Sequence, residues 1–168
     1  MAGTQSFDIT TGCDLQEVDN AINQALKEIR QRYDFKGLDV SIDFLRAENK
    51  IGLRAPDDFK LRAMWDIIQE KMVRRQVPLK NLQHGKVQPA AGGAVAQDVS
   101  LQQGIPIETA RAIVKFIKEL KIKRIQAEIQ GEQVRVSSPS RDDLQVVIGR
   151  IKEKDFGVEL KFGNYRTL

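Results

Sequence analysis

The chain contains 168 residues, 41% hydrophobic and 30% charged, which is typical of a globular protein rather than a disordered or fibrous one. No apolar run approaches the roughly 18 residues of a membrane span, and no signal-peptide pattern is visible. The single cysteine, Cys13, excludes an internal disulfide. We therefore expect a cytoplasmic protein without a membrane partner. The net charge of +4 comes from residues 85–168, where 14 Lys/Arg exceed 10 Asp/Glu, whereas residues 1–84 carry 13 of each; this asymmetry favours an anionic partner.

The first half predicts two helices and four strands. The alternation of "SFDIT" predicts a strand over residues 6–10, and a helical pattern follows from Asp14, a candidate cap, to Gly37. "LDVSIDFL" (38–45) and "KIGLRA" (50–55) alternate around a polar turn and predict a hairpin. A second helix should begin after Pro56, and a strand near residues 79–83 should close the unit.

The same order follows a stretch rich in Gly, Ala and Pro, which predicts a linker over residues 89–94. "AVAQDVSL" (94–101) reads as a strand and residues 106–120 as a helix. "RIQAEIQ" and "EQVRVSS" predict a hairpin around Gly131, a helix should span 140–151, and "GVELKF" (157–162) reads as the last strand.

The two halves match at an offset of 83 residues, which predicts an internal duplication. Ile51 corresponds to Val134, Pro56 to Pro139, and "IQEK" (68–71) to "IKEK" (151–154). A repeated strand–helix–strand–strand–helix–strand order predicts an α+β fold in which two helices cover one face of an antiparallel sheet. The expected domains are residues 1–88 and 95–168.

The turns "RAPDDFK" and "VSSPSRDD" occur at equivalent places in both halves, so we interpret them first as structural joints. Proline suits a first helical turn, and Asp57, Ser138 and Ser140 are placed to cap exposed amides. One histidine and one cysteine exclude a zinc site with several soft ligands, and neither a P-loop nor a GxGxxG motif is present. We therefore expect no enzyme activity, no cofactor and no metal site.

Positive charge is densest around the helix predicted over residues 106–120. Arg111, Lys115 and Lys118 share one helix face by their spacing, and Arg124 follows closely. These four residues form a candidate polyanion surface, although a solvated helix face explains them equally. The central strands carry no outward aromatic residue, which weakens the case for RNA recognition by base stacking on the sheet.

Several segments, "SFDI", "RYDFKG", "LQQGI", "IQAEIQGEQVRVSSPSRDDLQ" and "FGNYR", resemble the bacterial YajQ family over nearly the whole chain. The resemblance implies two ferredoxin-like domains of the RNA-recognition type and leaves open whether their first strands are exchanged. It also implies nucleotide binding without catalytic residues, with cyclic di-GMP binding and transcriptional control in some members. The tail "FGNY" departs from the family's "FKNF". Gly163 stands where the family has a lysine, so this chain lacks the phosphate contact that such a lysine would make.

Together these observations predict a non-enzymatic nucleotide-binding protein for a guanine nucleotide or cyclic di-GMP, with a regulatory role. The alternative is an RNA-binding protein, or one that interacts with a transcription factor, through the polyanion surface. In the tail, Tyr165 offers a stacking plane, Asn164 a donor and an acceptor, and Arg166 a bidentate phosphate partner. Arg135 and Arg141 are the nearest other cations. The competing interpretation is that the tail only docks against the core.

Overall fold

The computed structural model describes residues 3–167 and contains four α-helices and two antiparallel sheets within that range. The chain divides into two compact units. Unit 1 comprises Met1–Gly12 and Gly104–Leu168, and unit 2 comprises Cys13–Gln103. The predicted α+β class is confirmed.

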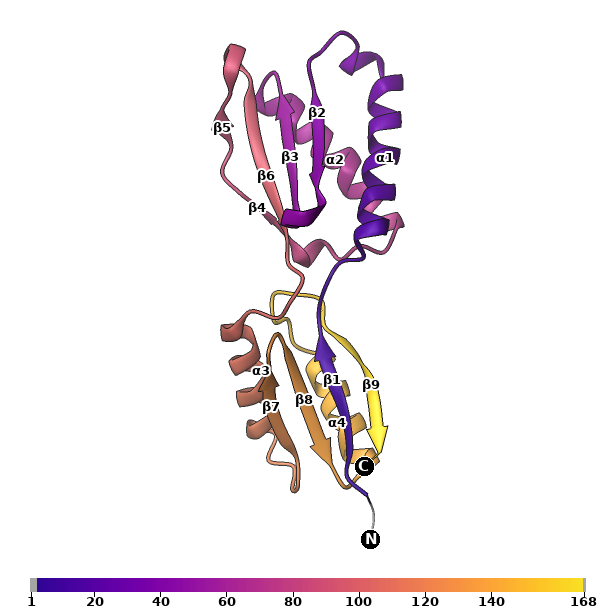
Figure 1. Cartoon of the computed structure of the whole chain (residues 1–168), viewed down its shortest axis with the longest axis vertical. Coiled ribbons are helices and arrows are strands. Elements are labelled where there is room, and N and C mark those ends of the chain that lie inside the picture. Colours follow the sequence, from indigo (N-terminus) through magenta and orange to yellow (C-terminus); the bar gives the residue numbers. More distant parts are fainter. Residues whose placement is uncertain (1–2, 168) are drawn as a thin grey trace. The chain divides into compact units, whose positions relative to one another are not determined.

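Unit 1 is a ferredoxin-like sandwich (Figure 1). Its sheet has the order β7-β8-β1-β9, and all neighbours are antiparallel. The strands are β1 (Gln5–Thr10), β7 (Gln126–Gln130), β8 (Gln133–Ser138) and β9 (Lys161–Thr167), and the helices are α3 (Ile107–Glu119) and α4 (Arg141–Lys152). Alternate strand residues, Phe7, Ile9, Val134 and Val136, are fully buried in one core with Ile113 and other residues of the two helices.

Unit 2 repeats this architecture with the sheet order β2-β3-β6-β4, and β5 pairs with β6 outside that path. Its strands are β2 (Ser41–Leu45), β3 (Lys50–Ala55), β4 (Leu82–His84), β5 (Gln88–Pro89) and β6 (Val95–Leu101), and its helices are α1 (Leu15–Gln31) and α2 (Asp58–Arg74). Both helices contribute buried residues to one core with Ile51, Leu53 and Val99 of the strands.

The first strands of the two repeats are exchanged. β1, at the start of the chain, pairs with β8 and β9 of the second half, while β6 pairs with β3 and β4 of the first half. The compact units therefore differ from the contiguous ranges 1–88 and 95–168 of the sequence repeat. Residues 89–94, predicted as a linker, lie inside unit 2 at the hairpin between β5 and β6, where Ala90 N donates to Ala94 O at 2.8 Å. The chain instead passes between units at residues 12–13 and 103–104.

The closing strand lies later than the alternation of residues 157–162 suggested. It spans Lys161–Thr167 and pairs with β1 at the edge of the sheet, beside the first strand as the repeat predicts. Gly157 has a φ of 88°, which takes the chain out of the extended conformation before the strand begins. The "FGNYR" tail is thus part of the sheet.

The two proline turns are structural joints, as the repeat suggested. Asp57 caps α2 by accepting from Lys60 N at 2.8 Å, and Ser140 caps α4 by accepting from Asp143 N at 3.2 Å. Ser138 accepts from Ser140 N at 3.0 Å and is buried. Each cap satisfies an amide at the start of a helix that has no partner within the helix itself.

Candidate functional site

The tail strand β9 carries a bulge that sends neighbouring side chains to opposite faces of the sheet. Gly163 pairs with Asp8 and Arg166 with Ser6, so both Asn164 and Tyr165 lie opposite Phe7. Asn164 adopts a φ of 53°, a left-handed conformation that asparagine tolerates better than most residues. Its side chain reaches Asp8, whereas the Tyr165 ring lies 6.2 Å from the Phe7 ring on the helix side.

Asp8 is the centre of a polar cluster on the open face of this sheet. Its side chain is only 5% exposed, and it accepts from Arg135 Nε at 2.9 Å and from Arg135 Nη2 at 3.4 Å. Asn164 Nδ2 also donates to it, and Arg166 Nη2 lies 3.7 Å from Asp8 Oδ2. The hydrogen bond from Arg135 is the main reason why the pKa of the Asp8 carboxyl is lower than usual, although burial opposes this effect.

The cluster changes the roles of two residues predicted to bind nucleotide. Arg135 and Asn164 are engaged with Asp8, and we assign them first to the structure of the sheet. A small cavity of about 290 Å³ lies beside them, lined by Asp8, Thr10, Gln133, Gly163 and Asn164. The open space around Gly163 is consistent with room for a longer side chain there.

The other three predicted residues, Arg141, Tyr165 and Arg166, line one cavity of about 430 Å³ in unit 1. Arg141 comes from the first turn of α4, and Tyr165 and Arg166 come from the end of β9. The remaining lining residues are Gln5, Ser6, Leu144, Gln145 and Thr167. Tyr165 is 59% exposed, so part of its ring is accessible. Two guanidinium groups, one phenol ring and two side-chain amides thus line the same space, and the Arg166 guanidinium is also ion-paired with Asp8.

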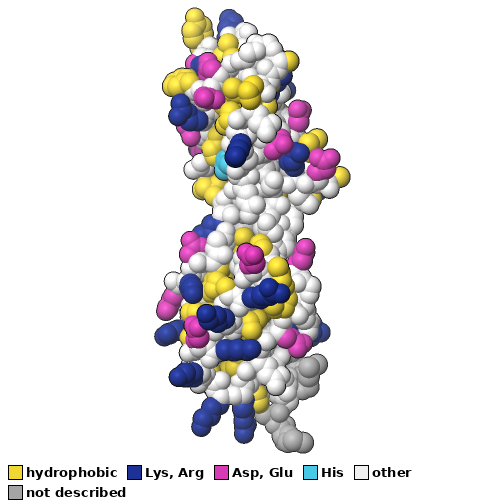
Figure 2. Space-filling view, turned by 90° about the vertical axis from the view of Figure 1, so that its left-hand side faces the viewer, with side chains coloured by type: hydrophobic (Ala, Val, Ile, Leu, Met, Phe, Trp, Pro, Cys, Tyr) yellow, Lys and Arg dark blue, Asp and Glu magenta, His cyan; other side chains and the backbone are white. Residues whose placement is uncertain are grey.

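The predicted polyanion surface lies on α3. Arg111, Lys115 and Lys118 are all exposed there, as their spacing predicted, and Arg124 is exposed just before β7. Figure 2 shows Lys and Arg side chains spread over the side of unit 1 that carries α3, with acidic and apolar side chains between them. The surface carries side chains of mixed type, unlike the cavity beside α4.

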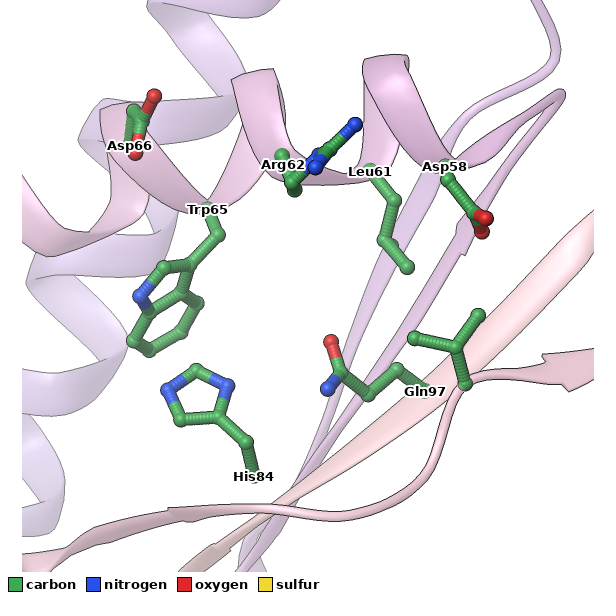
Figure 3. A pocket seen from close by; sticks show the side chains of 8 residues that line it. Asp58, Leu61, Arg62, Trp65, Asp66, His84 and Gln97 are labelled. Atoms are coloured by element: carbon green, nitrogen blue, oxygen red, sulfur yellow. The ribbon is translucent and has the colours of Figure 1, made fainter.

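Unit 2 contains a second cavity, of about 480 Å³, which the sequence did not indicate (Figure 3). It lies between α2 and the strands β4 and β6. Its lining residues are Asp58, Leu61, Arg62, Trp65, Asp66, His84, Val87 and Gln97. Trp65 and His84 form an edge-to-face pair with ring centroids 4.3 Å apart. Burial lowers the pKa of His84, which favours the neutral imidazole.

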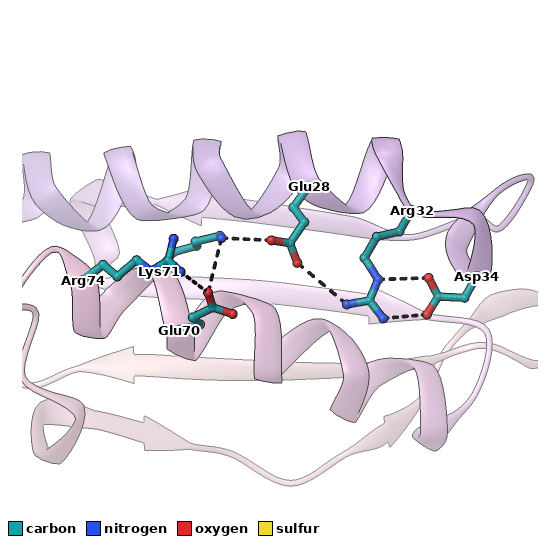
Figure 4. Close-up of polar contacts among 6 residues, drawn as sticks. All are labelled: Glu28, Arg32, Asp34, Glu70, Lys71 and Arg74. Carbon is teal, nitrogen blue, oxygen red and sulfur yellow. Dashed lines mark hydrogen bonds and ion pairs between the residues drawn. The ribbon is translucent and has the colours of Figure 1, made fainter.

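A separate charged network joins α1 and α2 of unit 2, and its charges compensate one another (Figure 4). The Lys71 side chain is 10% exposed and its Nζ lies 2.9 Å from Glu28 Oε1. Arg32 contacts Glu28 and holds Asp34 through two hydrogen bonds of 2.9 and 2.8 Å. The hydrogen bond from Lys71 is the main cause of the lowered pKa of Glu28. This pairing connects the two helices of unit 2.

Metal ligation and membrane insertion both bear on the class of site. Among residues 3–167, no group of three or more His, Cys, Asp or Glu side chains is placed to hold a metal ion. Within the same residues, no helix combines the length and the hydropathy needed to cross a membrane.

The family described as "Nucleotide-binding protein YajQ-like" matches residues 5–166 of the chain. The chain belongs to this family. A relative from Carboxydothermus hydrogenoformans, named "Nucleotide-binding protein", is 49% identical over 166 residues, which cover 99% of this chain and 100% of the relative. A relative of the same name from Trichlorobacter lovleyi is 50% identical over 161 residues, covering 96% and 98%. The resemblance inferred from the motifs is thereby confirmed.

Asp8, the centre of the polar cluster, is the main residue that sequence reasoning missed. It lies at an outward position of an alternating strand, which is a weak signal, and its partner Arg135 is 127 residues away. Gln5 and Ser6 of the unit 1 cavity were missed for the same reason, since their proximity to Arg141 depends on the exchanged strand, whereas Gln145 lies one turn after Arg141 on α4.

Proposed function

We propose that this protein binds a nucleotide in the unit 1 cavity through Arg141, Tyr165 and Arg166, and that it catalyses no reaction on that nucleotide. The observation that carries the proposal is the convergence of these three side chains on one cavity. Its volume of about 430 Å³ is within the range of about 300–1,000 Å³ that is usual for small-molecule sites. The names of the YajQ-like relatives support the same class of ligand.

Each side chain has a role that its chemistry suits. The Tyr165 ring offers a stacking plane for a base. Arg141 and Arg166 offer guanidinium groups that bind phosphate oxygens in a bidentate manner. Gln145 and Gln5 provide amide donors and acceptors to read the edge of a base. Guanine, which combines donors and an acceptor on one edge, suits such amides, so we propose a guanine nucleotide or cyclic di-GMP.

The proposal extends to a regulatory role in the cytoplasm. The cavity contains no pair of groups placed for general acid–base or nucleophilic catalysis among its lining residues. A protein that binds a nucleotide without converting it acts through the difference between its bound and free states.

Calorimetry with GMP, GTP, cyclic di-GMP and AMP tests this function directly. Arg166→Ala, Arg141→Ala and Tyr165→Ala should each weaken binding by about 1–3 kcal/mol, the range for losing a charged hydrogen bond or a stacked base. Arg150→Ala is the matched control, because Arg150 is exposed near the other end of α4 and does not line the cavity. Binding by all three variants at the affinity of the parent would refute the site, and absence of saturable binding by the parent would refute the function.

The second candidate function is RNA binding through the polyanion surface on α3. The exposure of Arg111, Lys115, Lys118 and Arg124 favours it. If all four side chains contact phosphates of a single-stranded RNA, the logarithm of the association constant should fall linearly with the logarithm of the salt concentration. The slope should be about −2.8, that is about −0.7 for each contact. Replacing the four residues by Ala should remove this slope and leave nucleotide binding in the cavity unchanged. A slope that the fourfold variant retains would exclude this surface.

A further inference from the structure

The cavity of unit 2 is the duplicated counterpart of the cavity of unit 1. Arg141, Leu144 and Gln145 of the unit 1 cavity lie 83 positions after Asp58, Leu61 and Arg62 of the unit 2 cavity, which is the offset of the sequence repeat. The leucine is retained at the shared position, while the arginine of unit 1 is replaced by an aspartate. The two cavities therefore share a framework and differ in charge.

The exchanged strands supply a second difference between the two cavities. Val136 of β8 pairs with Phe7, and its counterpart Leu53 of β3 pairs with Gln97. Gln97 thus occupies in unit 2 the position that Phe7 occupies in unit 1. Phe7 is fully buried in the core of its unit, whereas an amide takes this place in unit 2.

A glutamine at this position requires a reason, because its neighbours on the same face of β6, Val99 and Leu101, are buried apolar residues. A polar group on a core-facing position is costly unless it is hydrogen-bonded. Gln97 is only partly buried, and its Nε2 donates to Gly85 O at 2.8 Å in a solvent-exposed hydrogen bond, which satisfies one N–H. Figure 3 shows the amide oxygen directed into the space between Trp65 and Leu61.

The walls and rim of the cavity define the ligand that fits. Trp65, Leu61 and Val87 supply apolar and aromatic surface, and the paired His84 ring extends it. The rim carries Asp58 and Asp66 against one cation, Arg62, so its formal charge is negative. A phosphate group is disfavoured beside two carboxylates, whereas an uncharged aromatic ring is not.

From this arrangement we propose that the unit 2 cavity binds an uncharged planar heteroaromatic base, as in a nucleoside, with its ring against Trp65 and its edge hydrogen-bonded to Gln97. Base–aromatic contact and a paired amide are the two means by which proteins commonly hold an unstacked base. The site is separate from the nucleotide site proposed in unit 1, and it does not rest on that site.

Intrinsic fluorescence offers a test specific to this cavity, because Trp65 is the only tryptophan in the chain. The probes are guanosine and adenosine, each compared with its 5′-monophosphate. We expect a saturable change of Trp65 emission with at least one nucleoside and weaker binding of the corresponding monophosphate. No saturable change with either nucleoside up to about 10 mM, a concentration that detects even millimolar affinity, would overturn the proposal. Tighter binding of the monophosphate would also overturn it.

Two variants with a control sharpen the test. Gln97→Leu places an apolar residue where unit 1 has Phe7. It should reduce nucleoside affinity about tenfold, since one hydrogen bond contributes about that factor. Gln88→Leu, on the exposed neighbouring strand β5 outside the cavity, should leave the affinity unchanged. Unchanged affinity in Gln97→Leu would refute the role of the amide.

Asp66→Asn provides a variant that keeps the fold, because Asp66 is exposed on α2. It should strengthen binding of the monophosphate toward that of the nucleoside, since one carboxylate leaves the rim. An unchanged ratio of the two affinities would refute the exclusion of phosphate. Arg141→Ala should not alter the Trp65 response, so failure of the unit 1 site and failure of this site give different results.

Discussion

Asp8 stabilises unit 1 through its ionised form, and replacement of Asp8 by asparagine isolates that contribution. The substitution keeps the size of the side chain and one carbonyl oxygen, and it removes the negative charge. In the parent, the carboxylate accepts two hydrogen bonds from Arg135 and one from Asn164, and it lies 3.7 Å from Arg166. The variant leaves both arginines without their counter-charge.

The magnitude follows from the burial of the acid and the partial exposure of its partners. A hydrogen bond to a charged group contributes about 1.5–3 kcal/mol. The amide oxygen of the variant retains one hydrogen bond from the Arg135 guanidinium to an uncharged acceptor, and the arginine side chains, which are 27% and 42% exposed, recover some hydration. We therefore expect Asp8→Asn to lower the free energy of unfolding by about 2 kcal/mol at neutral pH.

The pH dependence gives the decisive readout. The pKa of Asp8 is lower in the folded protein than its ordinary value of 3.8, so ionised Asp8 stabilises the fold fully above pH 3.8. This stabilisation is lost as the pH falls through the lowered folded pKa. In urea unfolding, the difference between parent and Asp8→Asn should be constant from neutral pH to about 4 and should shrink below it.

A matched control is Asp43→Asn, since Asp43 is exposed on β2 of the other sheet. This substitution should change the free energy of unfolding by no more than about 0.5 kcal/mol. If the difference between parent and Asp8→Asn stays constant to the lowest pH at which the protein folds, the stabilisation does not come from the charge and the interpretation of the cluster is wrong.

Three further predictions concern stability. Ser140→Ala and Asp57→Ala remove equivalent caps, and each should cost about 1 kcal/mol in the free energy of unfolding; no loss in both would refute the capping role. The Asn164→Gly variant should have a free energy of unfolding about 1 kcal/mol higher than that of Asn164→Ala. Both variants lose the hydrogen bond to Asp8, but only alanine is strained at a φ of 53°. Equal free energies of unfolding would contradict the bulge geometry. Phe7→Ala should lower the free energy of unfolding by about 3–5 kcal/mol, because Phe7 is fully buried in unit 1. Amide hydrogen exchange should then accelerate in residues 104–167 and not in residues 13–88. Faster exchange in residues 13–88 instead would contradict the exchange of the first strands.

Local patterns were sufficient to predict most elements of both units. The hairpin of β7 and β8 follows from alternation around Gly131, and the helices α2 and α4 follow from the prolines and caps that precede them. The offset between Ile51 and Val134 was enough to predict the duplication, because equivalent core positions recur in both sheets. These features depend on neighbours close in the sequence.

The strand exchange could not be predicted from such patterns. β1 and β6 both alternate, and each presents buried residues such as Ile9 or Val99 to a pair of helices. Either strand would therefore satisfy the alternation of either sheet, and the choice depends on tertiary packing. The Asp8 cluster was missed for this reason, since Arg135 becomes its neighbour only when β1 lies beside β8.

The exchange also explains how one duplicated framework can hold two different cavities. In unit 1, α4 with Leu144 comes from the second half of the chain, and the exchanged strand β1 comes from the first half. In unit 2, α2 with Leu61 comes from the first half, and the exchanged strand β6 comes from the second half. A change in β1 therefore alters the core of unit 1 without altering the strand that contributes Gln97 to unit 2. Phe7 closes the core of unit 1 and leaves a cavity lined by Arg141 and Arg166, whereas Gln97 places a partly buried amide in the lining of the unit 2 cavity. Because the cationic and the acidic cavity are built from separate strands, a substitution in the lining of one cavity leaves the lining of the other unchanged.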